Sequence, residues 1–305
     1  MEPLLALVGP TASGKTEAGI RLAEALDAEI LSVDSMLVYR GMDIGTAKPT
    51  REQRARVPHH LLDLVEPSEP FSVAAFQAEA REAARGVRRR GRRPLLVGGS
   101  GLYYRAVVDD LEFPGTERSV RQELEAEAAA VGGDGLYGRL RDVDPVAASR
   151  IEPGNVRRTV RALEVAAITG RPFSSFAASW ESYPVERVRA AGIRMPAELL
   201  AARVERRVGD MLDAGWLDEV RALVEAGFGG WLTSTQAIGY AELARHLAGA
   251  LSLEEAVATT VKRTRAFARR QMAWFRRDPR IAWFDVGDGG AGEALDRIRA
   301  HLEPA

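Results

Sequence analysis

One segment near the start of the chain constrains the fold more than any other. Residues 9–16 read Gly-Pro-Thr-Ala-Ser-Gly-Lys-Thr and fill every fixed position of the pattern G-x-x-x-x-G-K-[ST]. The apolar run from Leu4 to Val8 precedes them, and residues 15–26 have the spacing of an amphipathic helix. A strand, a glycine-rich loop and a helix in this order predict a phosphate-binding loop in an α/β protein.

This loop offers several kinds of contact to a diphosphate. Its glycines allow backbone amides to approach phosphate oxygens, and the helix N-terminus adds a favourable partial charge. Lys15 is one of only three lysines among 42 lysines and arginines, so a compact ammonium is retained where a phosphate would need it. The hydroxyl of Thr16 predicts a Mg²⁺ ligand. The predicted diphosphate-binding residues are Gly9, Pro10, Thr11, Ala12, Ser13, Gly14, Lys15 and Thr16.

Strands alternate with helices over the first hundred residues. Residues 29–33 and 95–97 are short apolar strands, 60–65 is a third candidate, and 72–90 is helical. This alternation predicts a parallel sheet with helices on both faces. Residues 191–195 return to the sheet, and 197–225 and 253–276 are expected as long helices, the last with a capping box of Ser252 and Glu255.

The middle of the chain shows a different pattern. From residue 117 to 169 the periodicity is helical, with separate helices expected at 119–131, 135–143 and 155–168, and a loop over 172–184. We therefore expect an inserted all-helical subdomain over 116–189, within an α/β core formed by 1–115 and 190–305.

Composition excludes several classes of protein. The chain has no cysteine, which excludes disulfides and cysteine-based metal sites. Its start has no basic region before an apolar stretch, and no apolar run is long enough to span a membrane. These features predict a cytoplasmic protein without membrane association, and no obligate protein partner is indicated. The basic run 88–93 is interpreted as a solvated helix end and turn.

One acidic residue, Asp34, is expected beside the phosphate loop. It ends the apolar strand over residues 30–33, and ligands of open α/β sheets bind at the carboxyl ends of strands. A metal ligand, a general base, a sugar contact and a simple turn cap are all consistent with that place. A hydrolytic NTPase usually has an acid after a second apolar strand, but the strand over 95–97 ends in Gly98 and Gly99.

Several segments together resemble the tRNA dimethylallyltransferases, also called tRNA isopentenyltransferases. They are residues 9–16, 34–49 (DSMLVYRGMDIGTAKP), 58–61 (PHHL), 98–103 (GGSGLY), 237–240 (AIGY) and 269–276 (RRQMAWFR). The resemblance implies a P-loop NTPase/kinase-like core and a helical insertion that grips the anticodon stem-loop of tRNA. It also implies transfer of a dimethylallyl group from dimethylallyl diphosphate to the exocyclic amine of the adenosine just 3′ of the anticodon.

The resemblance also implies roles for individual residues. Asp34 is the expected proton acceptor, Lys15 the expected partner of the leaving diphosphate, and Ser100 the source of a hydroxyl near the reacting groups. Arg207, with Arg203 one helical turn earlier, would reach the diphosphate, although ordinary surface charge in an arginine-rich helix is an alternative.

Two groups of positions are expected near the RNA by this resemblance. Those near the modified base are Asp34, Ser35, Met36, Leu37, Ser100, Gln236, Ala237, Ile238, Gly239 and Tyr240. Those on the insert are Arg121, Arg157, Arg158, Thr159, Val160 and Arg161. A solvated helix face with a pair such as Arg161 and Glu164 is the alternative for the insert. It explains Arg157 and Arg158 less well, because cations at a helix start oppose the helix dipole.

Three positions depart from the family pattern. Ser100 replaces a more usual Thr, Leu37 a frequent Gln, and Ala241 a common basic residue. Other functions remain as alternatives: a P-loop kinase that uses ATP on a small metabolite, a non-catalytic RNA-binding module, and a prenyltransferase acting on free adenine nucleotides. The complete loop and Asp34 argue against the second, and Arg157 and Arg158 argue against the third.

Overall fold

The computed structural model describes residues 2–109, 111–180 and 182–303, and it divides into two compact units. The first unit comprises Met1–Val108 and Pro184–Ala305, and the second comprises Asp109–Tyr183. The range expected for the insert, 116–189, begins and ends a few residues later than the second unit. No helix in the part of the chain that the structure describes is long and apolar enough to cross a membrane.

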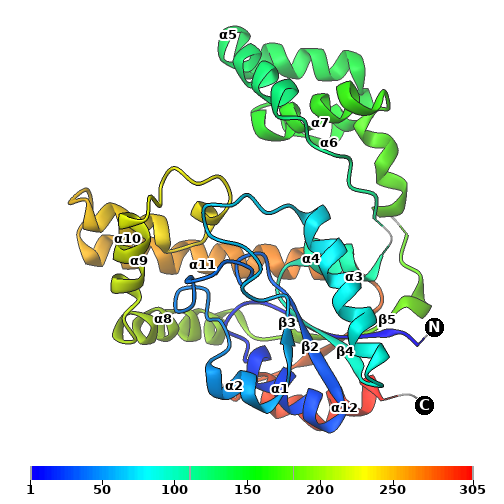
Figure 1. Ribbon diagram of the computed structural model, residues 1–305, viewed down its shortest axis with the longest axis vertical. Coiled ribbons are helices and arrows are strands. Elements are labelled where there is room, and N and C mark those ends of the chain that lie inside the picture. Colours follow the sequence, from blue (N-terminus) through cyan, green and yellow to red (C-terminus); the bar gives the residue numbers. More distant parts are fainter. Residues whose placement is uncertain (1, 110, 181, 304–305) are drawn as a thin grey trace. The chain divides into compact units, whose positions relative to one another are not determined.

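A six-stranded sheet forms the centre of the first unit (Figure 1). All its neighbouring strands are parallel, in the order β3-β2-β4-β1-β5-β6. The strands are β1 (Leu4–Val8), β2 (Ala28–Val33), β3 (His59–His60), β4 (Arg93–Gly98), β5 (Val188–Arg194) and β6 (Ile281–Asp285). The predicted parallel sheet is confirmed.

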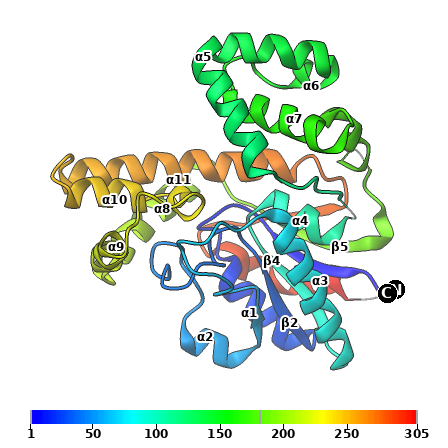
Figure 2. The same cartoon turned by 45° about the horizontal axis from the view of Figure 1, so that its top comes forward.

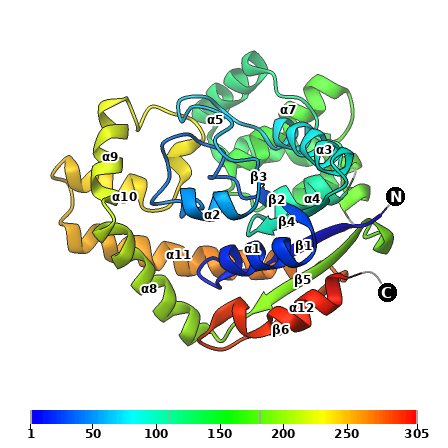
Figure 3. The same cartoon turned by 60° about the horizontal axis from the view of Figure 1, so that its bottom comes forward.

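Helices cover both faces of the sheet, and the side chains of β1 alternate between them. Leu5 and Leu7 pack with α1 (Lys15–Ala25) and α12 (Leu295–Leu302), which lie side by side in Figure 3. Ala6 and Val8 pack on the other face, toward α3 (Val73–Arg89), α4 (Gly101–Val108) and α8 (Ala197–Asp213). Strands with apolar side chains on both faces are typical of sheets buried between helix layers. The sheet's carboxyl ends therefore remain as the edge where a site can form.

Three sequence expectations about these elements were wrong. The third strand ends at His60 because Leu61 and Asp63 have φ values of 67° and 53°, which interrupt an extended backbone. The helix expected over 197–225 is two helices, α8 and α9 (Trp216–Glu225), separated at Gly215 with φ 96°. The expected loop over 172–184 contains a 3₁₀ helix at Phe173–Trp180, and a second 3₁₀ helix follows it at Val185–Arg187.

Several elements of the first unit were not predicted from the sequence. These are β6, α10 (Tyr240–Leu247) and α12, together with the short α2 (Arg51–Arg56) and α4. The long helix α11 (Leu253–Phe275) was predicted, and its capping box is confirmed. Ser252 N donates to Glu255 Oε2 at 2.8 Å, and Glu255 N donates to Ser252 Oγ at 3.1 Å.

The second unit is helical, as predicted (Figure 2). Its helices are α5 (Arg118–Val143), α6 (Pro145–Arg150) and α7 (Val156–Thr169). The backbone of α5 breaks at Gly132, where φ is 78°, so the two predicted helices 119–131 and 135–143 are present on either side. Leu124, Leu136, Leu140 and Leu163 are buried in the unit's own core. Such a core allows the insert to hold its shape independently of the sheet.

Candidate active site

The loop after β1 has a tightly turned backbone, with side chains that hydrogen-bond back to it. Ala12 and Gly14 both have left-handed backbone angles, with φ values of 63° and 84°. Ser13 is fully buried, and its hydroxyl donates to Pro10 O at 2.8 Å. Lys15 folds back so that its Nζ donates to Pro10 O at 2.5 Å. A glycine-rich loop that leads into a helix N-terminus can form a concave anion site with its backbone amides.

Distant parts of the chain hold the loop in place from outside. Thr11 N donates to Gln271 Oε1 of α11 at 2.8 Å, and Ala291 N donates to Ser13 O at 2.9 Å. Arg203 Nε donates to Ala12 O at 2.8 Å. Gln271 was not predicted as a site residue, although it lies in the segment 269–276 that carries the family resemblance. The sequence signal that could have identified Gln271 was therefore a polar side chain inside a family-specific motif.

Three cations converge on this loop. Arg207 Nη1 donates to Thr11 Oγ1 at 3.3 Å, and Arg203 approaches from the same helix. Burial, with the nearby charge of Arg207, lowers the pKa of Lys15 to about 7. Burial also lowers the pKa of Arg207, and the charge of Asp34 opposes that shift. A cluster of poorly solvated cations is stabilised by an anion, so the charge pattern favours binding of a diphosphate.

Asp34 lies directly after β2, on the loop side of the sheet edge. Its Oδ1 accepts a hydrogen bond from Met36 N at 2.9 Å, so it does cap the following turn. Burial nevertheless raises the pKa of Asp34, against the opposing effects of this hydrogen bond and of Lys15. A carboxylate that binds a proton more tightly is a better general base, so the cap and the base are compatible in one residue.

Ser100 directly precedes α4 and follows the end of the neighbouring strand β4. Its amide donates to Val33 O at 3.1 Å, which places Ser100 beside the end of β2 and hence near Asp34. A Cβ at Gly98 would lie 2.3 Å from Val33 O, and a Cβ at Gly99 would lie 2.2 Å from Gln271 Nε2. The two glycines after β4 are thus required by close approach of β2 and α11. The structure therefore brings together the predicted catalytic residues Asp34, Lys15 and Ser100.

The segment 34–49 is held by a buried lysine. Lys48 Nζ donates to Tyr39 O at 2.7 Å, to Asp43 Oδ1 at 2.6 Å and to Asp63 Oδ1 at 2.6 Å. Three acceptors arranged around one point suit an ammonium better than a planar guanidinium. This geometry explains why a chain rich in arginine keeps lysine here, and the role is structural.

The side chains of segment 236–240 differ in their exposure to solvent. Gln236 is exposed and Ile238 is half-buried, whereas Ala237, Gly239 and Tyr240 are buried. The Tyr240 hydroxyl donates to Glu219 Oε1 at 2.6 Å, and burial raises the pKa of Tyr240. In this conformation the Tyr240 side chain supports the turn from inside. Within this segment the side chains with exposed surface are those of Gln236 and Ile238.

Two basic residues of the insert hold a buried carboxylate. Arg121 and Arg161 each form a 2.7 Å ion pair with Glu164, whose side chain is fully buried. Burial disfavours the charge of Glu164, but the hydrogen bonds from the two arginines outweigh it and lower its pKa. The alternative pair of Arg161 with Glu164 is thus present.

The remaining insert positions predicted near RNA lie on α7. Thr159 and Val160 belong to the core of the unit, where they are 0% and 3% exposed. Arg157 and Arg158 are exposed on the first turn. The two arginines are therefore the exposed members of this group of predicted positions on α7.

A metal ion would have few protein ligands here. No group of three or more His, Cys, Asp or Glu side chains within residues 2–109, 111–180 and 182–303 is arranged to hold one. Thr16 is half-buried on the first turn of α1, next to Lys15. A single hydroxyl fits Mg²⁺, which is usually held by one or two protein oxygens together with substrate phosphates and waters.

Family models and curated relatives match nearly the whole chain. The family model described as IPP transferase matches residues 37–278, and that of isopentenyl transferase matches residues 2–63. The chain is 51% identical over 298 residues to the tRNA dimethylallyltransferase of Salinispora arenicola, covering 97% of this chain and 86% of that one. It is 48% identical to the tRNA dimethylallyltransferase of Kineococcus radiotolerans, covering 99% and 96%.

Solved structures show the same likeness. The full-length tRNA isopentenylpyrophosphate transferase of Bacillus halodurans superposes with a TM-score of 0.71 at 41% identity, covering 98% of this chain and 95% of that one. A eukaryotic dimethylallyltransferase described as acting on tRNA superposes with a TM-score of 0.80 at 27% identity, covering 98% and 78%.

Proposed function

The chain belongs to the IPP transferase family, and we propose that it transfers a dimethylallyl group from dimethylallyl diphosphate to a tRNA. The acceptor is the exocyclic amine of the adenosine 3′-adjacent to the anticodon, and diphosphate is released. The observation that carries this proposal is the placement of one carboxylate, Asp34, at the rim of a loop surrounded by three cations. A base and an anion site side by side match a reaction that removes a proton and expels a diphosphate.

Asp34 acts on the nucleophile. The lone pair of an adenine amine is delocalised into the ring, so the amine attacks efficiently only if its proton is removed as the C–N bond forms. The raised pKa of Asp34 suits it to accept that proton, and a positioned base contributes roughly 10²–10⁴ in rate. The Met36 amide fixes the orientation of its carboxylate.

The loop acts on the leaving group. As the C–O bond to the diphosphate breaks, negative charge grows on the oxygens, and Lys15, Arg203, Arg207 and the loop amides stabilise it. Bound Mg²⁺, held through Thr16, would supply further positive charge to the phosphate oxygens. The Ser100 hydroxyl lies at the adjoining strand end, where it can hydrogen-bond a group near the reacting atoms.

The RNA is bound by surfaces on both units. On the insert, Arg157 and Arg158 are suited to phosphates of the anticodon stem, and on the core Gln236 and Ile238 face outward near the turn that Tyr240 supports. The base must leave its stack to reach Asp34, as sequence-specific RNA readers commonly require. The insert's exposed arginines favour an RNA acceptor over a free nucleotide.

The kinase alternative is less consistent with the site. A P-loop kinase would require a second acid for magnesium, yet β4 ends at Gly98 and is followed by Gly99, and the two glycines pack against β2 and Gln271. On this side of β1 the strand ends therefore carry Asp34 after β2 and Gly98 and Gly99 at β4.

A direct assay separates the two functions. Unmodified tRNA is incubated with the protein, magnesium and dimethylallyl diphosphate without ATP, and its nucleosides are analysed by mass spectrometry. We expect an adenosine bearing a five-carbon adduct. Absence of the adduct, together with magnesium-dependent consumption of ATP, would refute the transferase and support the kinase.

A further inference from the structure

Helix α9 carries a carboxylate that is shared between two separate segments. Glu219 Oε2 accepts hydrogen bonds from Asp43 N and Ile44 N at 2.8 Å each. Its Oε1 accepts from Gly45 N at 3.2 Å and from the Tyr240 hydroxyl at 2.6 Å. Three consecutive amides around one carboxylate form an anion nest, and hydrogen bonds to a charged acceptor are the strong ones.

Trp216 lies one turn earlier on the same face of α9. Its indole is 2% exposed and packs edge-on against Tyr240 at 5.7 Å between ring centroids. A Cβ at Gly45 would lie 2.0 Å from the indole Nε1, and a Cβ at Gly239 would lie 2.1 Å from its Cη2. Both segments thus approach the ring so closely that only glycine fits. We call Trp216 and Glu219 the α9 clamp.

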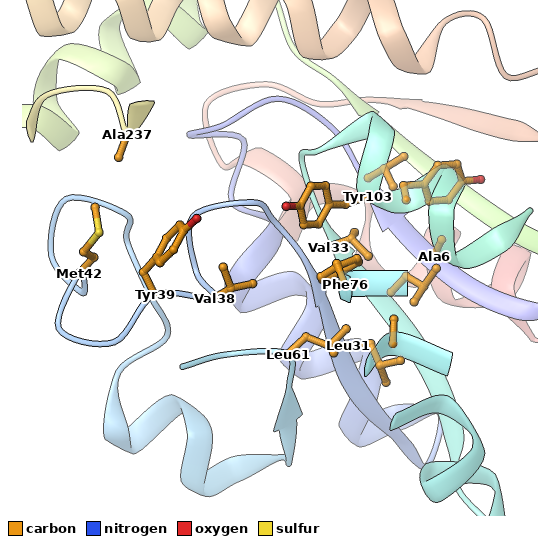
Figure 4. Packing of buried hydrophobic residues seen from close by; sticks show 14 of the residues in the cluster. Ala6, Leu31, Val33, Val38, Tyr39, Met42, Leu61, Phe76, Tyr103 and Ala237 are labelled. Carbon is orange, nitrogen blue, oxygen red and sulfur yellow. The ribbon is translucent and has the colours of Figure 1, made fainter. Parts of the chain in front are cut away.

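The clamped segments are the two that flank the proposed base-binding position. One is the loop from Asp34 to Lys48, and the other is the turn 236–240. Figure 4 shows Tyr39, Val38 and Met42 on the first segment and Ala237 on the second. Tyr39 Oη donates to Thr233 Oγ1 at 2.6 Å, which adds a further link between the loop and the chain leading into that turn.

The clamp acts on a different part of the site from the contacts that hold the phosphate loop. The phosphate loop is braced by Gln271, Arg203 and Ala291. The clamp instead fixes the loop that contains Met36, and the Met36 amide orients Asp34. A small displacement of that loop would therefore change the geometry of the acceptor base and of Asp34, and would leave the diphosphate contacts intact.

We propose that Trp216 and Glu219 are positioning residues that set the spacing of the two base-binding segments and so determine affinity for the RNA acceptor. The inference rests on the proposed function, because it takes the adenosine to bind between these segments. It assigns no contact with RNA to either residue. Their effect passes through the backbone of residues 43–45 and through Tyr240.

The test uses Glu219→Gln, which preserves shape and removes the charge. A glutamine presents one oxygen and one NH₂ group, so donors that face the NH₂ group lose their acceptor in either orientation. We expect KM for tRNA to rise about tenfold to a hundredfold, the factor that corresponds to hydrogen bonds to a charged group. The dissociation constant for dimethylallyl diphosphate should stay within about twofold.

Two further variants complete the set. Tyr240→Phe removes a single donor and keeps the three amides on Glu219, so its KM for tRNA should rise by a smaller factor. Glu225→Gln makes the same chemical change at an exposed position on the last turn of α9, and it should behave as the wild type. If Glu219→Gln does not fold, Tyr240→Phe alone tests the proposal.

Binding of an anticodon stem-loop RNA is measured beside turnover, since it requires no chemistry. Weaker RNA binding with unchanged diphosphate binding supports the clamp. Equal loss of both affinities would show a general structural role and overturn the proposal. Unchanged affinity for both ligands would also overturn it. A wild type that binds the stem-loop but forms no adduct would instead refute the proposed transferase.

Discussion

The charge of Lys15 leads to a quantitative prediction about diphosphate binding. Burial and then the charge of Arg207 lower the pKa of Lys15 from 10.5 to about 7, while Asp34 acts in the opposite direction. A diphosphate against the loop places negative charge next to the ammonium and raises this pKa again. Binding must therefore take up a proton wherever Lys15 is neutral in the free protein.

The size of the uptake depends on pH. At about pH 8, roughly a tenth of free Lys15 is protonated, so binding should take up roughly 0.9 proton; near pH 6 the uptake should be only about 0.1. By linkage, the contribution of Lys15 to affinity should fall about tenfold for each pH unit above 7.

Calorimetry measures this uptake directly. Dimethylallyl diphosphate is titrated into the protein without tRNA, in buffers of different ionisation enthalpy, at both pH values. Lys15→Met serves as the control, because methionine has similar length and no charge, and subtracting its uptake removes protonation of the ligand itself. Equal uptake by the two proteins at the higher pH would show that Lys15 is charged before binding and would refute the reasoning.

Three other predictions test separate parts of the structure. Asp34→Asn should lower the rate of adduct formation by about 10²–10⁴ and spare binding of both substrates, and in the wild type the rate should rise with pH through the raised pKa of Asp34; an equal rate in the variant would exclude Asp34 as the base. Arg157→Ala and Arg158→Ala should each reduce, by about one, the slope of log affinity for tRNA against log salt concentration. Filter binding over a series of salt concentrations measures this slope, and unchanged slopes would show that both arginines are ordinary solvated surface charges. Gly98→Ala should lower the free energy of unfolding by about 3 kcal/mol in urea titrations, because its Cβ would meet the backbone of β2, while Gly86→Ala in α3 meets only ordinary contacts and should not destabilise; similar stabilities of the two variants would contradict the packing argument.

Local patterns predicted the parts of the site that are contiguous in the chain. The phosphate loop, the strand before it and Asp34 at the end of β2 all depend on neighbouring residues, and all are present. The helical insert was also predicted, because a change from strand–helix alternation to helical periodicity is visible in one window.

Long-range contacts were not predictable in the same way. Gln271 meets Thr11 across 260 positions and Glu219 meets Asp43 across 176 positions, and neither pair shares a local pattern. The break at Gly215 did have a local signal, since glycine often ends a helix. The apolar periodicity continues on both sides of it, however, and this continuity led to the prediction of one helix instead of two.

Contacts within the scaffold explain why the sequence of segment 34–49 is distinctive for the family. Tyr39 reaches Thr233, Gly45 meets Trp216, and Lys48 binds three oxygens, so most of its distinctive residues hold the loop and do not face a substrate. A motif of this kind identifies a family because the scaffold tolerates few changes.

Leu37 differs from those residues in one respect. Its carbonyl accepts from Asp63 N at 3.1 Å, so its backbone is fixed, while its side chain is half-buried and does not belong to the buried clusters of the described residues. Replacing the glutamine frequent at this position therefore costs the scaffold little. It exchanges a hydrogen-bonding group for an apolar one beside Asp34, so we expect the departure at this position to change contact with the substrate more than it changes the fold.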